Sequence, residues 1–183
     1  MDRKQLLEKI IAREAAMFIA VKASEPADCQ EILKTFYLMR EMSHSVLAAD
    51  TLTSYLQDLE TAAAAGRNLM TEKYARMENL IPSLNENELI YKIVDIERKW
   101  LSEVHKKYPL TIAVEGGFTT YAVCELETYS DATLNLYYRD IFLAATQKRN
   151  LVEERYQYLY GNLGFKDLEE VEALAQKRAA VKE

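Results

Sequence analysis

Two glutamates stand where a helical core normally carries apolar side chains. Glu14 lies among Leu7, Ile11 and Phe18 at the three- and four-residue spacing of one helical face, and Glu97 lies in a similar seam 83 residues further on. A carboxylate is costly to bury unless it is paired, protonated or bound to a metal. We therefore predict that both glutamates face one shared site and are candidates for general acid–base catalysis. The alternative is that each forms a structural ion pair with an arginine.

A second set of residues has spacing that suits a metal. Glu41 and His44 form a Glu-x-x-His sequence, which carboxylate-bridged two-metal bundles use twice, with one glutamate from each of two other helices. The second copy is missing, because Val123 and Leu126 stand near its positions. A single divalent metal held by Glu41, His44 and one seam glutamate is the metal hypothesis. The alternative, which we favour, is that His44 is a partly exposed surface residue.

The chain repeats itself at an offset of 82 residues. Residues 51–74 and 133–156 share 11 identities in 24 positions, where chance gives roughly one or two. A unit this long, present twice, favours two packed halves over an open solenoid, which needs at least three repeats. We predict a single helical domain over residues 1–183 with repeats at about 3–80 and 86–162, related by a pseudo-twofold axis.

Aligning the two repeats also shows positions where the residue type differs between them. Arg40 lies on the apolar face of its predicted helix, and Ala122 aligns with it in the second half. This asymmetry makes Arg40 a ligand-binding candidate. Glu125 and Tyr129 lie nearby in sequence to Ala122 and are predicted to line the same polar site.

An Arg-Asn-Leu motif occurs in both halves. Arg67 and Arg149 begin the two copies, where one helix ends and the next begins, and could hold an anion such as a carboxylate. The alternative is that each arginine fixes the corner between helices by pairing with Asp58 or Asp140.

The composition favours an all-α fold of two four-helix halves plus a peripheral C-terminal helix over 166–183. The chain has only 5 glycines and 3 prolines in 183 residues, too few for the many tight turns of an all-β protein. Capping signals predict where the helices begin. These starts are Asp2, Asp28, Asp50, Asn68, Ser83 with Glu86, Thr119, Ser130, Asn150 and Asp167.

The net charge and the motifs that are missing from the sequence argue against several classes of binding partner. The net charge of −6, with both signs interleaved, argues against nucleic acid. No run of 18 apolar residues or signal peptide is present, so we expect no membrane span and a cytoplasmic location. No phosphate loop or dinucleotide fingerprint occurs, so no nucleotide cofactor is expected.

Several stretches resemble a bacterial family known as a domain of unknown function, family 4125. They are Gly66 to Met77, Cys29–Gln30, Met39–Arg40 and Glu125 to Ser130. The chain departs from the family pattern at residues 24–28, where the family has a glycine-rich turn, and at His44, where it has glutamine. The resemblance implies a helical protein with paired motifs and implies no activity.

Together these features predict a small-molecule site between the two repeats, suited to acid–base chemistry. One alternative is a non-enzymatic helical module that binds a protein partner or forms a homodimer. The other is a carboxylate–histidine metal-binding protein.

Overall fold

The computed structural model describes residues 2–22, 29–114 and 116–181, so the helix start predicted at Asp28 lies outside the described residues. Over these ranges the chain is all-helical and contains no strand, which confirms the predicted class. The helices are α1 (Arg3–Lys22), α2 (Cys29–His44), α3 (Ala49–Ala64), α4 (Leu69–Met77), α5 (Leu89–Lys107), α6 (Phe118–Leu126), α7 (Asp131–Thr146), α8 (Leu151–Asn162) and α9 (Leu168–Ala180).

The two repeated asparagines begin helices as predicted. The side-chain oxygens of Asn68 and Asn150 accept hydrogen bonds from backbone N–H groups in the first turns of α4 and α8, which otherwise lack partners. Their amide groups also donate to preceding helices, from Asn68 to the Met17 carbonyl at 2.9 Å and from Asn150 to the Trp100 carbonyl at 3.1 Å. Each asparagine therefore caps one helix and fastens it to another.

Two predicted helix starts were wrong. Asp50 lies within the first turn of α3 and pairs with Arg139 instead of capping the helix. Ser83 is too early, since α5 begins at Leu89, whose N–H donates to the side chain of Asn87 at 2.9 Å. The beginning of α3 is held by Asp140, which is distant in sequence, whereas the acceptor at the beginning of α5 is the nearby Asn87.

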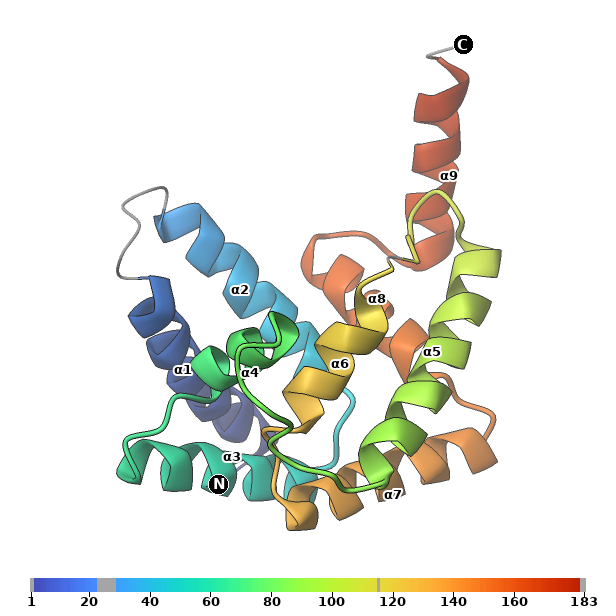
Figure 1. The fold of residues 1–183 in the computed structure, drawn as a ribbon. Coiled ribbons are helices and arrows are strands. Elements are labelled where there is room, and N and C mark those ends of the chain that lie inside the picture. The colour runs from blue at the N-terminus through green and yellow to red at the C-terminus, as the bar shows by residue number, and fades with distance from the viewer. Residues whose placement is uncertain (1, 23–28, 115, 182–183) are drawn as a thin grey trace.

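The helices surround a shared core in a regular scheme. α1 packs against α2, α3 and α4, while α5 packs against α6, α7 and α8. Contacts between the two groups run from α3 to α7, from α4 to α6 and from α2 to α8. In Figure 1, α3 and α7 lie along the base of the molecule, and α9 projects from the opposite side, where it contacts α8.

The α3–α7 contact is reciprocal. Asp140 of α7 accepts a hydrogen bond at 2.9 Å from the backbone N–H of Ala48, which precedes α3. Asp58 of α3 accepts one at 3.0 Å from the backbone N–H of Ser130, which precedes α7. An aspartate within each helix thus holds the beginning of the other.

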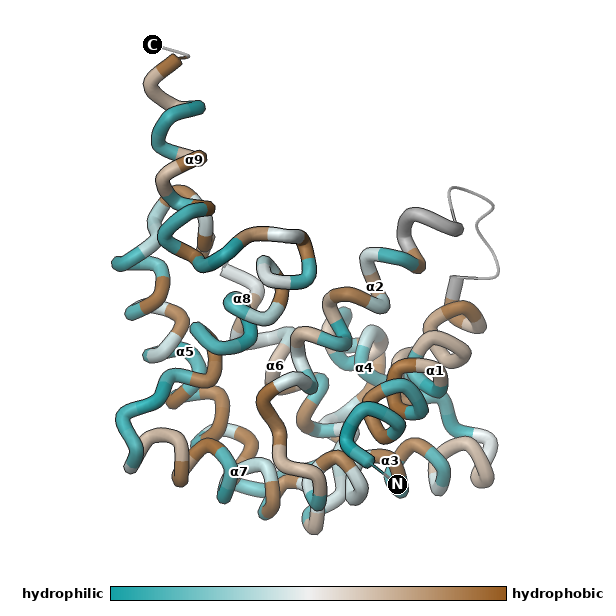
Figure 2. The backbone as a smooth tube through the Cα atoms, turned by 180° about the vertical axis from the view of Figure 1, so that it is seen from behind, coloured by the Kyte–Doolittle hydropathy of each residue, from teal (hydrophilic) through white to brown (hydrophobic). Residues whose placement is uncertain are grey.

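Buried apolar side chains from both groups of helices form one core. Figure 2 shows hydrophilic and hydrophobic segments mixed along the helices. No helix in the described ranges is both long enough and apolar enough to cross a membrane.

We predict that Asn150→Ala lowers the free energy of unfolding by about 1 kcal/mol, because it removes the α8 cap and the bond to Trp100. Chemical denaturation monitored by circular dichroism measures this change. The control is Asn135→Ala on the exposed face of α7, which should change stability by less than about 0.5 kcal/mol. Equal effects of the two substitutions would contradict the capping role.

Candidate functional site

Glu14 is the centre of a completely buried polar cluster. Its side chain is 0% exposed. One carboxylate oxygen accepts from Arg40 Nη2 at 2.5 Å and Tyr55 Oη at 2.8 Å, and lies 3.0 Å from His44 Nε2. The other accepts from Arg40 Nε at 2.9 Å. The prediction that Glu14 is buried among basic and tyrosine partners is confirmed.

Arg40 joins this cluster to α6. Its guanidinium also donates to Glu125 of α6 at 2.7 and 3.1 Å, so two carboxylates share one buried cation. Lys73 of α4 adds a second cation to Glu125, at 3.1 Å. Tyr121 of α6 accepts from the same Lys73 ammonium at 3.0 Å. With Tyr55 of α3, which donates to Glu14, five helices meet at this network.

Glu97 forms a smaller cluster in the second half. Its Oε1 atom accepts a hydrogen bond from Tyr137 Oη at 2.9 Å and forms an ion pair with Arg155 Nη2, also at 2.9 Å. Arg155 Nη2 also donates to Tyr137 Oη at 2.6 Å. Glu97 is only 4% exposed, so the predicted burial and basic and tyrosine partners are confirmed here as well.

The Glu97 cluster is less complete than the Glu14 cluster. Arg155 Nε is shielded from solvent and has no hydrogen-bond partner among the described residues. Glu97 Oε2 has no hydrogen bond to a described residue either, but this oxygen is not fully shielded from solvent. A native core normally satisfies almost all such groups, so this incomplete cluster marks a place where another molecule could supply the missing partners.

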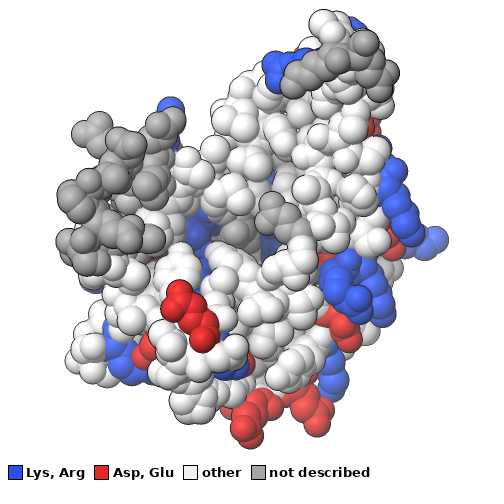
Figure 3. Space-filling model, turned by 45° about the horizontal axis from the view of Figure 1, so that its top comes forward, with Lys and Arg blue, Asp and Glu red and all other residues white. Residues whose placement is uncertain are grey.

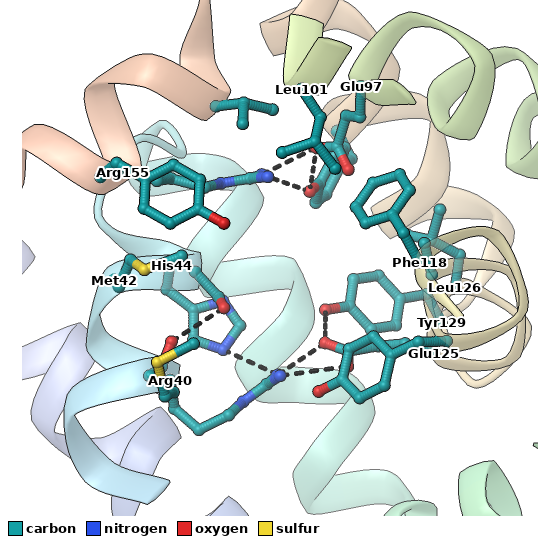
Figure 4. Close-up of a pocket in the computed structure, with 17 residues that line it drawn as sticks. Arg40, Met42, His44, Glu97, Leu101, Phe118, Glu125, Leu126, Tyr129 and Arg155 are labelled. Carbon is teal, nitrogen blue, oxygen red and sulfur yellow. Dashed lines mark hydrogen bonds and ion pairs between the residues drawn. The ribbon is translucent and has the colours of Figure 1, made fainter. Parts of the chain in front are cut away.

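A cavity of about 240 Å³ lies beside these groups. Its polar lining comes from α2 (Arg40, Ser43, His44), α5 (Glu97), α6 (Tyr121, Glu125), α7 (Tyr137) and α8 (Arg155, Tyr156), with Tyr129 from the α6–α7 connection. Figure 4 shows Glu97 and Arg155 on one side and Arg40, His44 and Glu125 on the other. In Figure 3 the surface is hollowed near the centre, and Lys and Arg side chains are visible inside the hollow.

Apolar side chains complete the cavity wall. They are Met39, Met42, Leu101, Phe118, Ala122, Leu126 and Val152. Tyr129 packs against Tyr55 with the rings tilted by 30° and their centroids 4.4 Å apart, and meets Tyr137 edge-on at 6.3 Å. The repeated tyrosines are therefore bridged by an aromatic residue that belongs to the cavity itself.

The buried charges stabilise one another. Burial disfavours the ionised form of Glu14, but Arg40 and His44 lower its pKa to about 2. Burial likewise opposes ionisation of Glu125, yet Arg40 and Lys73 hold its pKa well below the usual range. For Arg155 burial would lower the pKa, and Glu97 with Tyr137 raises it above that of an ordinary arginine. The cavity wall is therefore lined by ionised groups of both signs.

Three predicted ligand-binding residues meet at this cavity, and two do not. Arg40, Glu125 and Tyr129 all line it. Arg67 and Arg149 lie outside it, on the surface, where each pairs with a glutamate five residues later, at 2.7 and 2.6 Å. The suggested pairing with aspartates of α3 and α7 was wrong, because those aspartates hold helix beginnings at the α3–α7 contact.

The predicted metal ligands do not converge. His44 is only 1% exposed, so the expectation of a partly exposed surface residue was wrong. Its imidazole faces Glu14, whereas Glu41 accepts a hydrogen bond from Tyr158 Oη of α8 at 2.8 Å. Among the described residues, no three His, Cys, Asp or Glu side chains form a group that could hold a metal ion.

Two important basic residues were missed. Lys73 and Arg155 occupy equivalent positions at the 82-residue offset, and both are buried. The repeat itself carried a usable signal, since a basic residue recurs there between apolar helix positions. Their roles differ because Lys73 reaches Glu125 of the other half, whereas Arg155 pairs with Glu97 of its own half.

We predict that Glu14 contributes pH-dependent stability. Its folded-state pKa of about 2 lies below the ordinary value of 4.5, so the contribution is present above pH 4.5 and is lost as the pH falls towards 2. The expected size is on the order of 3 kcal/mol. In urea titrations at several pH values, the stability difference between wild type and Glu14→Gln should shrink over this window.

Glu8→Gln is the control, because Glu8 lies on the same helix with its side chain 64% exposed. It should remain close to wild type throughout. A stability difference between wild type and Glu14→Gln that stays constant from pH 5 to about pH 2 would contradict the charged state assigned to Glu14.

The comparisons with known proteins identify the family. No curated protein and no solved structure matches the chain. Residues 4–173 match the family described as "Protein of unknown function (DUF4125)". The matched range includes the helices that line the cavity. The resemblance inferred from the motifs is thereby confirmed, and the chain belongs to the DUF4125 family.

Proposed function

We propose that this protein binds a small molecule in the cavity between its two groups of four helices. The observation that carries the proposal is Arg155, a buried guanidinium in the cavity wall whose Nε has no partner in the described chain. An unsatisfied buried donor costs about 1–3 kcal/mol. A ligand that shifts the Arg155 side chain towards the cavity and offers this donor an acceptor would recover that free energy on binding.

The size and lining of the cavity support a compact ligand. Its volume of about 240 Å³ is slightly below the range of roughly 300–1,000 Å³ typical of ligand pockets. A mostly apolar wall with a few charged groups is the usual composition of such sites. The ligand is therefore expected to have an apolar body and a polar end.

We also propose that the two groups of helices are duplicated halves about a pseudo-twofold axis, which places the cavity at their junction. The reciprocal contacts of Asp58 and Asp140 support this arrangement, because symmetric interfaces make each contact twice. The caps formed by Asn68 and Asn150, with bonds to α1 and α5, support it further. One rotation should superpose α1, α3 and α4 on α5, α7 and α8, and unrelated helix directions would contradict the duplication.

The duplication gives a reason for the cavity. Ala122 of α6 aligns with Arg40 of α2, and Ala122 lines the cavity. In the first half the Arg40 guanidinium completes the partners of Glu14. In the second half a methyl group stands at the equivalent position and leaves room beside Glu97. The ligand would occupy the space that an arginine fills in the other half.

Acid–base catalysis is the second candidate function. The favouring observation is that His44, a cavity residue, lies 3.0 Å from the carboxylate of Glu14. A carboxylate in this position orients an imidazole for proton transfer. Glu97 lines the same cavity and could exchange a proton from the opposite side. In this scheme Glu14 acts through His44, and Glu97 acts directly on the ligand.

We predict that filling the cavity abolishes ligand binding. Ala122→Leu places a larger side chain in the cavity wall, so the fold should persist while the ligand loses its space. The measurement is the shift in melting temperature with a panel of small carboxylic acids, amines, amino acids and amides. The control is Ala145→Leu, on the exposed face of α7.

Compounds that stabilise the wild type and the control, but not Ala122→Leu, would support the proposal. If the compounds that bind shift all three proteins equally, they bind elsewhere and the cavity is not the site. If no compound in the panel stabilises the wild type, the small-molecule proposal loses to the protein-interaction alternative.

A further inference from the structure

We infer that the ligand is a zwitterionic α-amino acid with an apolar side chain, bound through its carboxylate to Arg155 and through its ammonium group to Glu97. This inference rests on the proposed function and specifies the chemistry of the same cavity. It follows from three features of the site, which are the unused hydrogen-bonding groups, the balance of buried charges and the apolar wall.

The unused groups are one donor and one acceptor side by side. Arg155 uses Nη2 for Tyr137 and Glu97, and its Nε is without a partner in the described chain. Glu97 uses Oε1, and its Oε2 makes no hydrogen bond to any residue that the structure describes. The missing partners are therefore an acceptor for the guanidinium and a donor for the carboxylate. In an α-amino acid both groups are attached to one carbon, which suits two protein groups that are themselves in contact, as Arg155 and Glu97 are through Nη2 and Oε1 at 2.9 Å.

The buried charges favour a ligand with no net charge. Three cations, Arg40, Lys73 and Arg155, face three carboxylates, Glu14, Glu97 and Glu125. The formal charges of these six side chains cancel. A simple anion or a simple amine would add an uncompensated charge to a site whose own charged groups are mostly buried, which is unfavourable. A zwitterion adds both signs and leaves the balance unchanged.

The rest of the wall specifies the side chain of the ligand. Leu101 and Phe118 lie near Glu97 in Figure 4. Leu126 and Val152 line the same cavity. These residues exclude a second charged group and reward burial of apolar surface. The volume of about 240 Å³ admits an aliphatic or single-ring side chain. A leucine- or phenylalanine-like ligand fits these limits.

Isothermal titration calorimetry of the full chain tests the ligand class. The probes are L-leucine and L-phenylalanine, their N-acetyl derivatives, which lack the cation, and isopentylamine and phenethylamine, which lack the carboxylate. We expect a free amino acid to bind at least about tenfold more tightly than either derivative, because each derivative leaves one charged group unpaired. A derivative that binds as tightly as the amino acid, or no binding by either amino acid, overturns the inference.

Substitutions test the two contacts. Arg155→Lys and Glu97→Gln should each weaken amino-acid binding at least about tenfold. Arg149→Lys and Glu154→Gln are matched controls, since these residues form an exposed ion pair that lies partly on the same helix. Circular dichroism confirms that each variant is folded before titration. Unchanged affinity in either folded site variant overturns the inference.

The outcomes separate this inference from the proposed function. If an N-acetyl derivative or an amine binds equally well, and Ala122→Leu abolishes that binding, the cavity is a ligand site and only the amino-acid assignment fails. If amino acids bind but Ala122→Leu binds them unchanged, the cavity proposal fails with it.

Discussion

The arrangement of the helices depends on one buried guanidinium, that of Arg40. It lies between Glu14 of α1 and Glu125 of α6, and therefore connects two helices that are far apart in sequence. Removing one partner from such a buried ion network typically costs about 3–5 kcal/mol, because an unpaired charge remains. Lys73 supplies the second positive charge near Glu125 and extends the network to α4. The polar residues in this core are thus mutually dependent, and they fix the cavity wall as a unit.

Glu14 and Glu97 show how similar positions can acquire different chemistry. Both are buried and both accept a hydrogen bond from a repeated tyrosine. Both carboxylate oxygens of Glu14 accept hydrogen bonds. Among the described residues, only one carboxylate oxygen of Glu97 has partners, and Glu97 lines the cavity together with Tyr137 and Arg155. A saturated carboxylate stabilises the fold, and an incompletely paired one can exchange partners with a ligand. The difference lies in the neighbouring helix, not in the glutamates themselves.

The sequence predicted the all-helical class, most helix starts, and the burial of both seam glutamates, because these depend on local periodicity and capping. It also indicated Arg40, Glu125 and Tyr129 as site residues. It did not predict that His44 is buried or that Arg155 completes the Glu97 cluster, since these contacts depend on how the helices cross. His44 and Glu14 are 30 residues apart, and Arg40 and Glu125 are 85 apart. For the same reason the beginning of α3 was misplaced, because its partner Asp140 is 92 residues from Ala48 in sequence.

The reciprocal bonds of Asp58 and Asp140 at the α3–α7 contact have an evolutionary implication. Paired contacts of this kind are what two identical subunits form across a twofold axis. Under the proposed duplication, an ancestral half could assemble as a homodimer, but any pocket on its axis would present the same groups from both sides. Fusion into one chain lifts that restriction, because each copy can then mutate independently. The exchange between Arg40 and Ala122 is a change that only a single-chain descendant can make on one side, and it allows recognition of a molecule whose two ends differ.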